Sequence, residues 1–574
     1  MMDRQAVART LEQIASFLEL KGENTFRIRA MLTAARAVNG LPVDLETALA
    51  DGSLAAARGV GPATLKIIEE LARTGRSSLL EDLREQIPPG LVEMLAVSGL
   101  GVTKVRQIHE ALGIDSLTEL EAAARDGRLA KLPRFGPRTA ENILKSISFL
   151  RQTTGVRLAH HAAGEAAAIR QALQSLPGVT RAVVAGEVRR RLELIGEIVI
   201  VLIAEASPEE IFSRLGALPG VSEFAGQDER RVTLRFAGGS AVQVVVTTPV
   251  NAGAVLVQAT GSDEHLQQLA ARAGERGFVF NGAALWEGSR FVPTPDEAAL
   301  YQALDLQEIP PELREGRGEA AAAAGREIPR LIEPGDLQGF IHCHTTYSDG
   351  SCSVADLADA CRAAGYRYLG ITDHSRSAAY AGGLAEDDLV RQAEEIDAVN
   401  AGHAGFRVLK GVEADILVDG RLDYDDATLA RLDFVIGSIH TRFQLDRDEM
   451  TARVLAAMDN PFLSILGHPT GRLLLGRSPY AIDLDRVFAK AAANGIAIEI
   501  NADPHRLDLD WRELRRAAAA GVMISIGADA HSIATMGHME YGVGIARKGW
   551  LRREDVLNTR PVEEFLAFVH KRRG

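Results

Sequence analysis

The sequence predicts a multidomain protein with an all-helical N-terminal region, a mixed α/β middle region and a C-terminal parallel sheet or barrel. Three observations support this prediction. The chain has 574 residues, which is enough for three or four domains of ordinary size. Residues 1–150 are rich in Ala, Leu, Glu and Arg at helical spacing, with short Gly and Pro turns between the helices. From about residue 337, short apolar runs alternate with helical stretches, which is the pattern of repeated strand–helix units.

The composition is that of a globular protein, with 46% hydrophobic and 25% charged residues. No apolar run reaches the roughly 20 residues that a membrane helix needs. Residues 1–5 lack the basic and apolar regions of a signal peptide. The three cysteines, Cys343, Cys352 and Cys361, show no disulfide framework. We therefore expect a cytoplasmic location and no membrane partner.

The net charge of −13 argues against a protein that coats nucleic acid over its whole surface. No segment carries a broad basic stripe. Any contact with nucleic acid is therefore expected to be local and to weaken as the salt concentration rises.

Three Gly/Pro turns in residues 1–150 are alike, and each is followed by an apolar-periodic helix. They are residues 59–63 (Gly-Val-Gly-Pro-Ala), 99–104 (Gly-Leu-Gly-Val-Thr-Lys) and 132–139 (Leu-Pro-Arg-Phe-Gly-Pro-Arg-Thr). Glycine allows close approach of another molecule, and the N–H groups that begin the next helix bind a phosphate. The turns resemble helix–hairpin–helix motifs, which hold DNA by its backbone without reading sequence.

The expected DNA-binding residues of these turns are Gly59, Gly61, Gly99, Gly101, Lys104, Gly136 and Arg138. The alternative is a plain helical hairpin with a glycine turn and no DNA contact. Three similar copies favour this alternative less than a single copy would. The third copy departs most, because Arg134 stands where the first glycine is expected.

Residues 26–30 (Phe-Arg-Ile-Arg-Ala) resemble the opening of the small domain of family X DNA polymerases. Some members of that family carry a Schiff-base lysine near the first hairpin, which removes an abasic sugar. In this chain Lys66 is the nearby lysine, one position early, and Ile67 stands in the expected place. This departure argues against lyase activity.

The family X resemblance continues to about residue 320. It is found in the strand region 186–202, in residues 260–265 (Thr-Gly-Ser-Asp-Glu-His) and in residues 309–319 (Ile-Pro-Pro-Glu-Leu-Arg-Glu-Gly-Arg-Gly-Glu). The last two stretches are typical of bacterial members. The resemblance implies an α/β nucleotidyltransferase palm followed by a thumb.

The residues that should bind nucleotide and metal depart from the family pattern. Nucleotidyl transfer needs a cluster of carboxylates that holds two Mg²⁺ ions. The family has three aspartates where this chain has Glu197, Val199 and Gln243. Glu187 replaces the serine that contacts phosphate, and residues 258–259 (Gln-Ala) replace the aromatic pair beside the nucleotide sugar. We therefore expect a polymerase domain without polymerase activity.

Nine side chains of metal-ligand type are found in the C-terminal region, mostly where a short apolar run ends. They are His342, His344, Asp349, His374, Glu413, His440, His468, Asp529 and His531. Because parallel strands end at one face of a sheet or barrel, these side chains should meet there. A single histidine after a strand is more often a core or surface residue. Nine buried imidazoles and carboxylates would cost several kcal/mol each unless paired or bound to metal.

The ligand types also constrain the metal. Side chains alternate along a strand, so His342 and His344 should face one side and Cys343 the other. Imidazole and carboxylate without thiolate suit Zn, Mn or Fe in a catalytic site.

This ligand set resembles that of the PHP (polymerase and histidinol phosphatase) family of metal-dependent phosphoesterases, over about residues 337–574. The resemblance implies a distorted seven-stranded (β/α) barrel around two or three divalent metals. It assigns one metal to His342, His344, Glu413 and Asp529, a second to Glu413, His440 and His468, and a third to Asp349, His374 and His531. Glu413 would bridge metals, and His374 and His531 would position the phosphate or a metal.

Together the resemblances divide the chain into a hairpin region (1–150), a palm and thumb (151–318), a linker (319–336) with a short helix at 320–324, and the PHP domain (337–574). They imply a metal-dependent DNA phosphodiesterase, a 3′→5′ exonuclease in DNA repair, with abasic-site endonuclease activity left open. The expected partner is gapped or nicked DNA, or a 3′ end, bound without sequence preference by a monomer.

Three alternatives remain at this stage. The first is a gap-filling polymerase that uses Glu197 with unconventional ligands. The second is a small-molecule phosphomonoesterase similar to histidinol phosphatase, which would have no use for DNA-binding hairpins. The third is a DNA-binding scaffold without catalysis, which would have no use for a complete ligand set.

Overall fold

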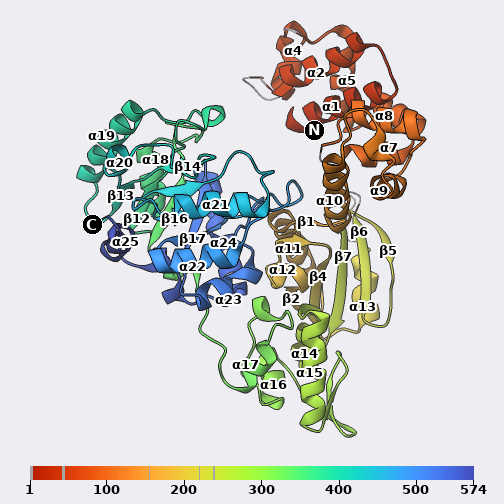
Figure 1. The fold of residues 1–574 in the computed structure, drawn as a ribbon. Coiled ribbons are helices and arrows are strands. Elements are labelled where there is room, and N and C mark those ends of the chain that lie inside the picture. The colour runs from red at the N-terminus through yellow and green to blue at the C-terminus, as the bar shows by residue number, and fades with distance from the viewer. Residues whose placement is uncertain are drawn as a thin grey trace. The chain divides into compact units, whose positions relative to one another are not determined.

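The computed structural model describes residues 4–39, 41, 45–57, 59–97, 99–153, 155–216, 218, 220–236 and 240–573. The chain divides into two compact units, residues 1–154 and residues 155–574 (Figure 1). Within the described residues, no helix combines the length and the apolarity required to cross a membrane. All three cysteines are free.

The N-terminal unit is all-helical in its described residues, as the sequence predicts. Its helices are α1 (Arg4–Leu20), α2 (Thr25–Asn39), α3 (Leu45–Ala50), α4 (Ser53–Ala56), α5 (Pro62–Thr74), α6 (Ser78–Gln86), α7 (Pro89–Leu95), α8 (Val102–Leu112), α9 (Leu117–Arg125), η1 (Leu129–Lys131) and α10 (Pro137–Thr153). Buried apolar side chains such as Leu11, Phe17 and Ile108 form one core. Proline opens α5 and α10, where its fixed φ suits a helix and its missing N–H costs nothing.

The second unit begins with a palm built on a five-stranded sheet in the order β2-β4-β7-β6-β5. The strands are β2 (Val179–Ala185), β4 (Ile198–Ala204), β5 (Val221–Ala225), β6 (Arg231–Phe236) and β7 (Ala241–Thr247). β4 runs parallel to β7, and the other pairs are antiparallel. Nearby lie β1 (Arg157–Leu158), β3 (Leu194–Ile195), α11 (Ala159–Gln174), α12 (Gly186–Arg189) and α13 (Pro208–Leu215). Every residue of β4 is buried, which places it at the centre of this core.

The thumb follows. Its elements are η2 (Pro249–Asn251), α14 (Ala252–Thr260), α15 (Asp263–Glu275), β8 (Phe278–Phe280), β9 (Leu285–Glu287), β10 (Arg290–Val292), α16 (Glu297–Ala303), η3 (Pro311–Leu313) and α17 (Glu319–Ala324). The expected short helix at 320–324 is therefore present. The expected linker 319–336 is instead packed against the thumb as far as Leu331, because its apolar residues join the thumb core. Nδ1 of the buried His265 lies 2.7 Å from Oε1 of the buried Glu319.

The C-terminal part is a curled parallel sheet whose described strands run in the order β13-β12-β11-β18-β17-β16-β15-β14. They are β11 (Gly339–Cys343), β12 (Tyr368–Ile371), β13 (Arg407–Lys410), β14 (Glu413–Asp415), β15 (Ile436–Ser438), β16 (Ile465–Leu466), β17 (Ala497–Asn501) and β18 (Ile524–Ala530). The two edge strands, β13 and β14, are separated in sequence by only two residues, Gly411 and Val412. One interrupted stretch thus pairs with β12 on one side and β15 on the other, so the sheet curls as in the expected seven-stranded barrel.

Helices between and after these strands pack outside the sheet (Figure 1). They are α18 (Val354–Ala363), α19 (Glu386–Gly402), α20 (Asp426–Leu429), α21 (Arg447–Ala457), α22 (Leu484–Asn494), α23 (Trp511–Ala519), α24 (Met539–Lys548) and α25 (Val562–His570). Short 3-10 turns lie at η4 (Pro334–Asp336), η5 (Ala379–Ala381), η6 (Ile533–His538), η7 (Arg553–Asp555) and η8 (Leu557–Thr559). The apolar faces of strands and helices form one large core and a second, smaller cluster that includes Tyr368, Phe434 and Phe565.

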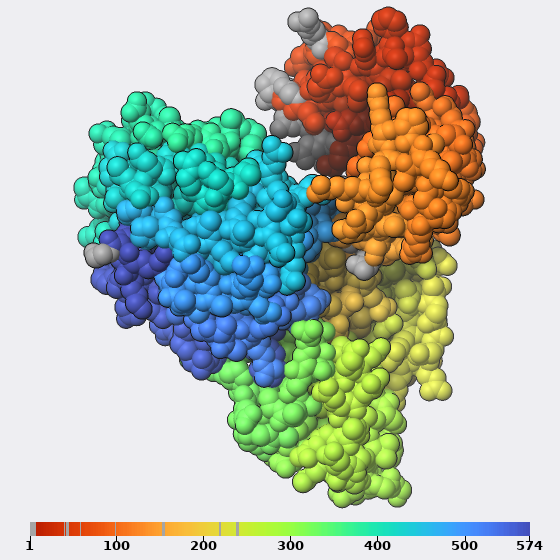
Figure 2. Space-filling model, viewed as in Figure 1, coloured from red at the N-terminus to blue at the C-terminus, as the bar shows by residue number. Residues whose placement is uncertain are grey.

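Polar side chains join the barrel to the palm and thumb, which touch in the space-filling view (Figure 2). Trp511 Nε1 donates to Glu193 at 3.0 Å, and Arg512 donates to the same carboxylate at 2.9 Å. The buried Lys548 donates to Glu315 at 2.5 Å and to the carbonyl of Arg190 at 3.1 Å. Buried ion pairs of this kind stabilise a protein only when their geometry is good. They therefore fix how the barrel packs against the palm and thumb.

Candidate metal centre

The structure gathers the nine predicted side chains at the C-terminal ends of the barrel strands. Glu413 lies at their centre, within 3.7 Å of five imidazoles. Its Oε1 faces Nε2 of His468 at 2.9 Å and Nε2 of His342 and His440, each at 3.4 Å. Its Oε2 faces Nδ1 of His374 at 3.0 Å and Nε2 of His344 at 3.7 Å. The two oxygens thus serve two different groups of imidazoles, which is the arrangement expected of a bridging carboxylate.

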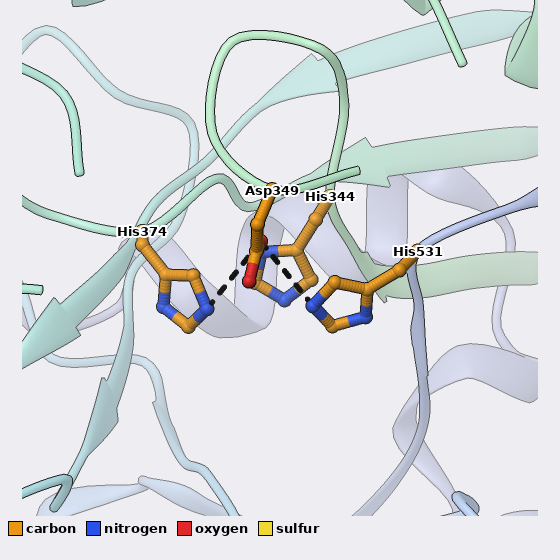
Figure 3. A group of neighbouring side chains, drawn as sticks. All are labelled: His344, Asp349, His374 and His531. Carbon is orange, nitrogen blue, oxygen red and sulfur yellow. Dashed lines mark ion pairs between the residues drawn. The ribbon is translucent and has the colours of Figure 1, made fainter. Parts of the chain in front are cut away.

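A second group surrounds Asp349 (Figure 3). Its Oδ1 lies 3.3 Å from Nε2 of His531, 3.7 Å from Nε2 of His374 and 3.9 Å from Nδ1 of His344. The rings of His344 and His531 are stacked, with centroids 4.3 Å apart. The expected set of Asp349, His374 and His531 is therefore close together and is enlarged by His344.

Two further groups are compact enough for one ion each. His342, His344 and Asp529 form one of them, and Asp529 Oδ1 lies 3.2 Å from Nε2 of His344. His374, Glu413 and His440 form the other. His344 and His374 each belong to two of the three groups, whereas the expected assignment gave each of them to one metal. His468 reaches Glu413 but lies outside these three groups.

The chemistry of these donors fits divalent metals. Several buried ligand atoms lack a hydrogen-bond partner, among them His342 Nε2, His344 Nε2, His374 Nδ1 and Glu413 Oε2. Buried polar atoms without a partner are rare in proteins, because each forfeits its hydration. Divalent ions held between these atoms would supply the missing partners.

The protonation of the centre shows how strongly these groups interact. Burial alone would raise the pKa of Glu413, but the imidazoles of His440, His342 and His374 hold it well below its usual range. Burial would lower the pKa of His531, but the carboxylates of Asp349 and Asp529 raise it to about 9. The pKa of His440 rises to about 10 for the corresponding reason, with Glu413 and Asp415 as its partners.

The backbone is strained at three candidate ligands. His342, His468 and Asp529 have φ values of 59°, 23° and 49°, in a region that side-chain-bearing residues rarely adopt. Such conformations cost of order 1–3 kcal/mol each and are concentrated at functional sites. The pairing of β11 with β18 shifts register between Ile341 and Cys343. The strand is thus irregular at His342, yet both imidazoles reach the centre and Cys343 lies in the apolar core, as expected.

Sequence reasoning missed the carboxylates that orient the ligands. Nδ1 of His342 lies 2.5 Å from Oε1 of Glu499, whose other oxygen accepts from the backbone N–H of His468 at 2.7 Å. Nδ1 of His440 lies 2.6 Å from Asp415. Such contacts fix the imidazole tautomer and leave Nε2 for a metal. The available signal was a carboxylate inside an apolar strand, Glu499 between Ile498 and Ile500.

Two other polar residues complete the centre. Arg506 lies 3.3 Å from Oδ2 of Asp529, and Asn501 donates to the same oxygen at 3.0 Å. Asp373, which precedes a candidate ligand, instead accepts from the N–H and hydroxyl of Thr345 at 2.7 and 2.6 Å. It therefore shapes the loop that carries Asp349.

The predicted palm residues also lie together. Gln243 Nε2 donates to Oε1 of Glu197 at 3.2 Å, and Val199 is buried beside them in register with Gln243. Oε2 of Glu187 accepts from the N–H of Gly196 at 2.6 Å and from the N–H of Glu197 at 3.2 Å. Burial and the charge of Glu187 raise the pKa of Glu197. Two backbone N–H groups at the start of β4 are thus already occupied by a carboxylate.

The three hairpins share one backbone conformation. Gly59 and Gly99 have φ values of 100° and 83°, and Arg134, at the equivalent place in the third copy, has 69°. The following glycines, Gly61, Gly101 and Gly136, face open space where a Cβ would stand. Arg138 lies in the first turn of α10. Lys104 donates to the carbonyl of Gly99 at 2.7 Å, so its amine is held beside the turn.

Comparison with known families covers most of the chain. Residues 2–77 match the helix-hairpin-helix domain, and residues 91–148 match the SAM-like helix-hairpin-helix tandem. Residues 255–315 match the DNA polymerase beta thumb, and residues 341–503 match the PHP domain.

One relative extends over the whole chain. The "DNA polymerase/3'-5' exonuclease PolX" of Bacillus subtilis is 35% identical over 575 residues, which cover 99% of this chain and 100% of that protein. The chain belongs to the bacterial family X DNA polymerases that carry a C-terminal PHP domain. Other relatives match only part of the family X chain. A "Probable phosphatase" of Acetivibrio thermocellus is 32% identical over 164 residues, 28% of this chain and 63% of that protein. Another, from Caldanaerobacter subterraneus, is 40% identical over 101 residues, 17% of this chain and 37% of that protein.

Proposed function

We propose that this family X chain is a metal-dependent DNA phosphodiesterase that removes nucleotides from 3′ ends during DNA repair. The observation that carries the proposal is the Glu413 carboxylate, whose two oxygens face separate groups of buried imidazoles. Sites with two divalent metals suit the hydrolysis of phosphodiesters because they stabilise both the attacking and the leaving oxygen. The printed name of the Bacillus subtilis relative includes a 3'-5' exonuclease.

The residues that would hold the metals are those of the three compact groups, with His468 added through Glu413. Zn, Mn or Fe would suit these donors. When bound, such metals lower the pKa of water and neutralise charge on phosphate oxygens. Glu499 and Asp415 hold His342 and His440 in the orientation that presents Nε2.

Three side chains at the edge of the centre are suited to hold the phosphate. His531 is partly exposed, and its Nε2 lies 3.3 Å from Oδ1 of Asp349. His374 approaches the same carboxylate from the opposite side (Figure 3). Arg506 brings a permanent positive charge next to Asp529. Charged donors placed at a phosphate stabilise the extra charge that develops during its cleavage.

For the palm, we propose DNA binding without polymerisation. The carboxylate of Glu187 occupies backbone N–H groups of the kind that bind phosphate. Gln243 donates a hydrogen bond to the carboxylate of Glu197, and the apolar Val199 supplies no oxygen ligand. Hard divalent ions need several oxygen ligands, and Glu197 alone does not provide them.

The hairpins would bind the DNA backbone without sequence preference, and the palm and thumb would present the DNA end to the barrel. The contacts of Glu193 and Lys548 give the palm and barrel a fixed register for this purpose. Abasic-site cleavage is a second reaction open to the same centre. Two alternative functions remain. The shorter relatives, named as probable phosphatases, suggest a phosphomonoesterase. The name of the Bacillus subtilis relative includes a DNA polymerase, so polymerase activity is the other alternative.

One experiment separates these functions. The purified full chain is incubated with 3′-labelled and with 5′-labelled DNA in Mn²⁺, with and without dNTPs. Stepwise shortening from the 3′ end, unaffected by dNTPs, is the expected result. Internal cuts at an abasic site would identify the endonuclease, and phosphate release without shortening would identify a monoesterase.

A further inference from the structure

An exposed aromatic ring stands at the rim of the metal centre. The side chain of Tyr380 is 72% exposed, yet its ring centroid lies 6.3 Å from that of His374. Partial burial and the nearby carboxylates of Asp415, Glu413 and Asp349 raise the pKa of its hydroxyl to about 12. The hydroxyl therefore stays protonated, and much of the ring remains open to solvent.

The loop that carries this ring is fastened at both ends. The backbone N–H of Ser375 donates to the carbonyl of Glu413 at 3.0 Å, and the N–H of Leu384 donates to the carbonyl of His374 at 2.8 Å. The loop is thus attached directly to two candidate metal ligands.

The middle of the loop is also held in place by hydrogen bonds. Ser377 donates to the buried Asp423 through its N–H at 2.7 Å and through its hydroxyl at 2.5 Å. A Cβ at Gly383 would lie 1.9 Å from the carbonyl oxygen of Ser375, so the turn closes too tightly for a side chain. The ring is therefore exposed on a loop with many local hydrogen bonds.

Single exposed aromatic residues are ordinary on protein surfaces. Tyr380 differs because its loop holds the ring beside His374, one of the imidazoles around Asp349. A nucleotide whose phosphate reached that group would have its base near the ring. Aromatic rings bind bases of any sequence by stacking, because every base has a π face.

We propose that Tyr380 is a positioning residue that stacks against the terminal base of the DNA strand being shortened. The proposal rests on the DNA phosphodiesterase function given above and names the part of the substrate that the rim of the site recognises. Stacking on Tyr380 would also favour DNA over small phosphate esters that have no base. Tyr380 would then act on the placement of the 3′ end and not on the chemistry of bond cleavage.

The test combines one change in the protein with one change in the DNA, as in a double-mutant cycle. KM and kcat are measured in Mn²⁺ for Tyr380→Ala and the unsubstituted chain, each on DNA with a normal 3′-terminal nucleotide and on DNA whose 3′-terminal nucleotide lacks its base. Loss of one base stack corresponds to about 1–3 kcal/mol, or roughly 5–150-fold in affinity. Either change alone should raise KM by that amount with a smaller effect on kcat. Both changes together should raise it no further, because they remove the same contact.

Tyr380→Trp and Tyr380→Phe should restore a low KM, whereas Val390→Ala, which shortens an exposed apolar side chain on the barrel helix α19, should behave like the unsubstituted chain. Hydrolysis of bis(p-nitrophenyl) phosphate by the unsubstituted chain reports separately on phosphodiesterase chemistry. If that chemistry is present but Tyr380→Ala leaves KM unchanged, the stacking proposal is wrong. Additive penalties in the cycle would also overturn it. Absence of any diester cleavage would instead remove the proposed function.

Discussion

Oε1 of Glu499 lies 2.5 Å from Nδ1 of His342, although the two residues are 157 positions apart in the sequence. The same carboxylate accepts from the backbone N–H of His468 at 2.7 Å. One buried side chain from the middle of the barrel thus orients two candidate ligands on other strands. Gly527 makes this possible, because a Cβ there would lie 1.9 Å from Oε1 of Glu499.

The first prediction concerns this carboxylate. Glu499→Gln should lower metal affinity by about 10–100-fold, which is typical for loss of a group that orients a ligand. The amide retains the shape but loses the charge that fixes the His342 tautomer. Metal affinity is measured by competition with a chelator of known affinity. Glu513→Gln, on the outer helix α23, is the matched control and should keep full affinity. Equal affinities in the two variants would contradict this role.

The second prediction tests the metal assignment itself. Asp529→Ala or His344→Ala should abolish nuclease activity without unfolding the chain, because each removes a ligand atom from the compact group with His342. The loss should be at least about 10–100-fold, since it affects a direct ligand. Cleavage of labelled DNA gives the activity, circular dichroism gives the fold, and elemental analysis gives the metals bound. Near-normal cleavage by either variant would show that the assignment is wrong.

The third prediction concerns the hairpins. Gly61→Leu and Gly101→Leu should weaken binding of all DNA sequences alike, because the added side chain would cover N–H groups at the start of α5 and α8. Both glycines have negative φ and open space at Cβ, so the fold should tolerate the change. Gly335→Leu, in the segment before the barrel, has the same open space and serves as control. Binding is followed by fluorescence anisotropy; unchanged affinity would make the hairpins structural only.

The fourth prediction is a pH dependence of stability. Burial lowers the pKa of Lys548 from an ordinary 10.5 to about 8, with Glu315 opposing the shift. Between these two values the unfolded chain binds more protons than the folded chain. Raising the pH from about 8 to 10.5 should therefore stabilise the folded state, by roughly 3 kcal/mol at most.

Lys548→Met removes this titration and supplies the reference. The Tm of the unsubstituted chain, measured relative to that of Lys548→Met, should rise across this pH window and stay constant below it. Lys490→Met, at an exposed ion pair with Asp459, should show no such trend. A difference in Tm that is independent of pH, or that falls as pH rises, would contradict a buried charged Lys548.

The sequence predicted the nine candidate ligands, which the structure brings close together, because strand-end positions can be read directly from apolar runs. It did not predict Glu499 or Asp415, since a carboxylate inside a strand has the same appearance whether it faces solvent or a ligand. The strained φ of His342 could not be predicted from the sequence either, because the irregularity there depends on how β11 pairs with β18. The segment 319–331 looked like a linker, and only tertiary packing of Glu319 against His265 reveals it as part of the thumb.

The last prediction is that the palm does not extend a primer. Two-metal phosphoryl transfer depends on positioning and on neutralising charge, so the missing carboxylates at Val199 and Gln243 should remove most of the metal affinity. Glu187 adds a second obstacle, because its carboxylate already accepts from the N–H groups of Gly196 and Glu197. A triphosphate would have to displace that carboxylate and would be repelled by its charge.

Primer extension on gapped DNA with Mg²⁺ or Mn²⁺ measures this directly, in a His344→Ala background so that the nuclease does not degrade the product. Glu187→Ser should free the two N–H groups yet leave extension absent, because the metal ligands are still missing. Replacing Val199 and Gln243 by aspartate together with Glu187→Ser is the variant in which activity should first be detectable. Template-directed incorporation by the His344→Ala chain alone, lost on Glu197→Ala, would show instead that Glu197 suffices for catalysis and that the palm is an active polymerase.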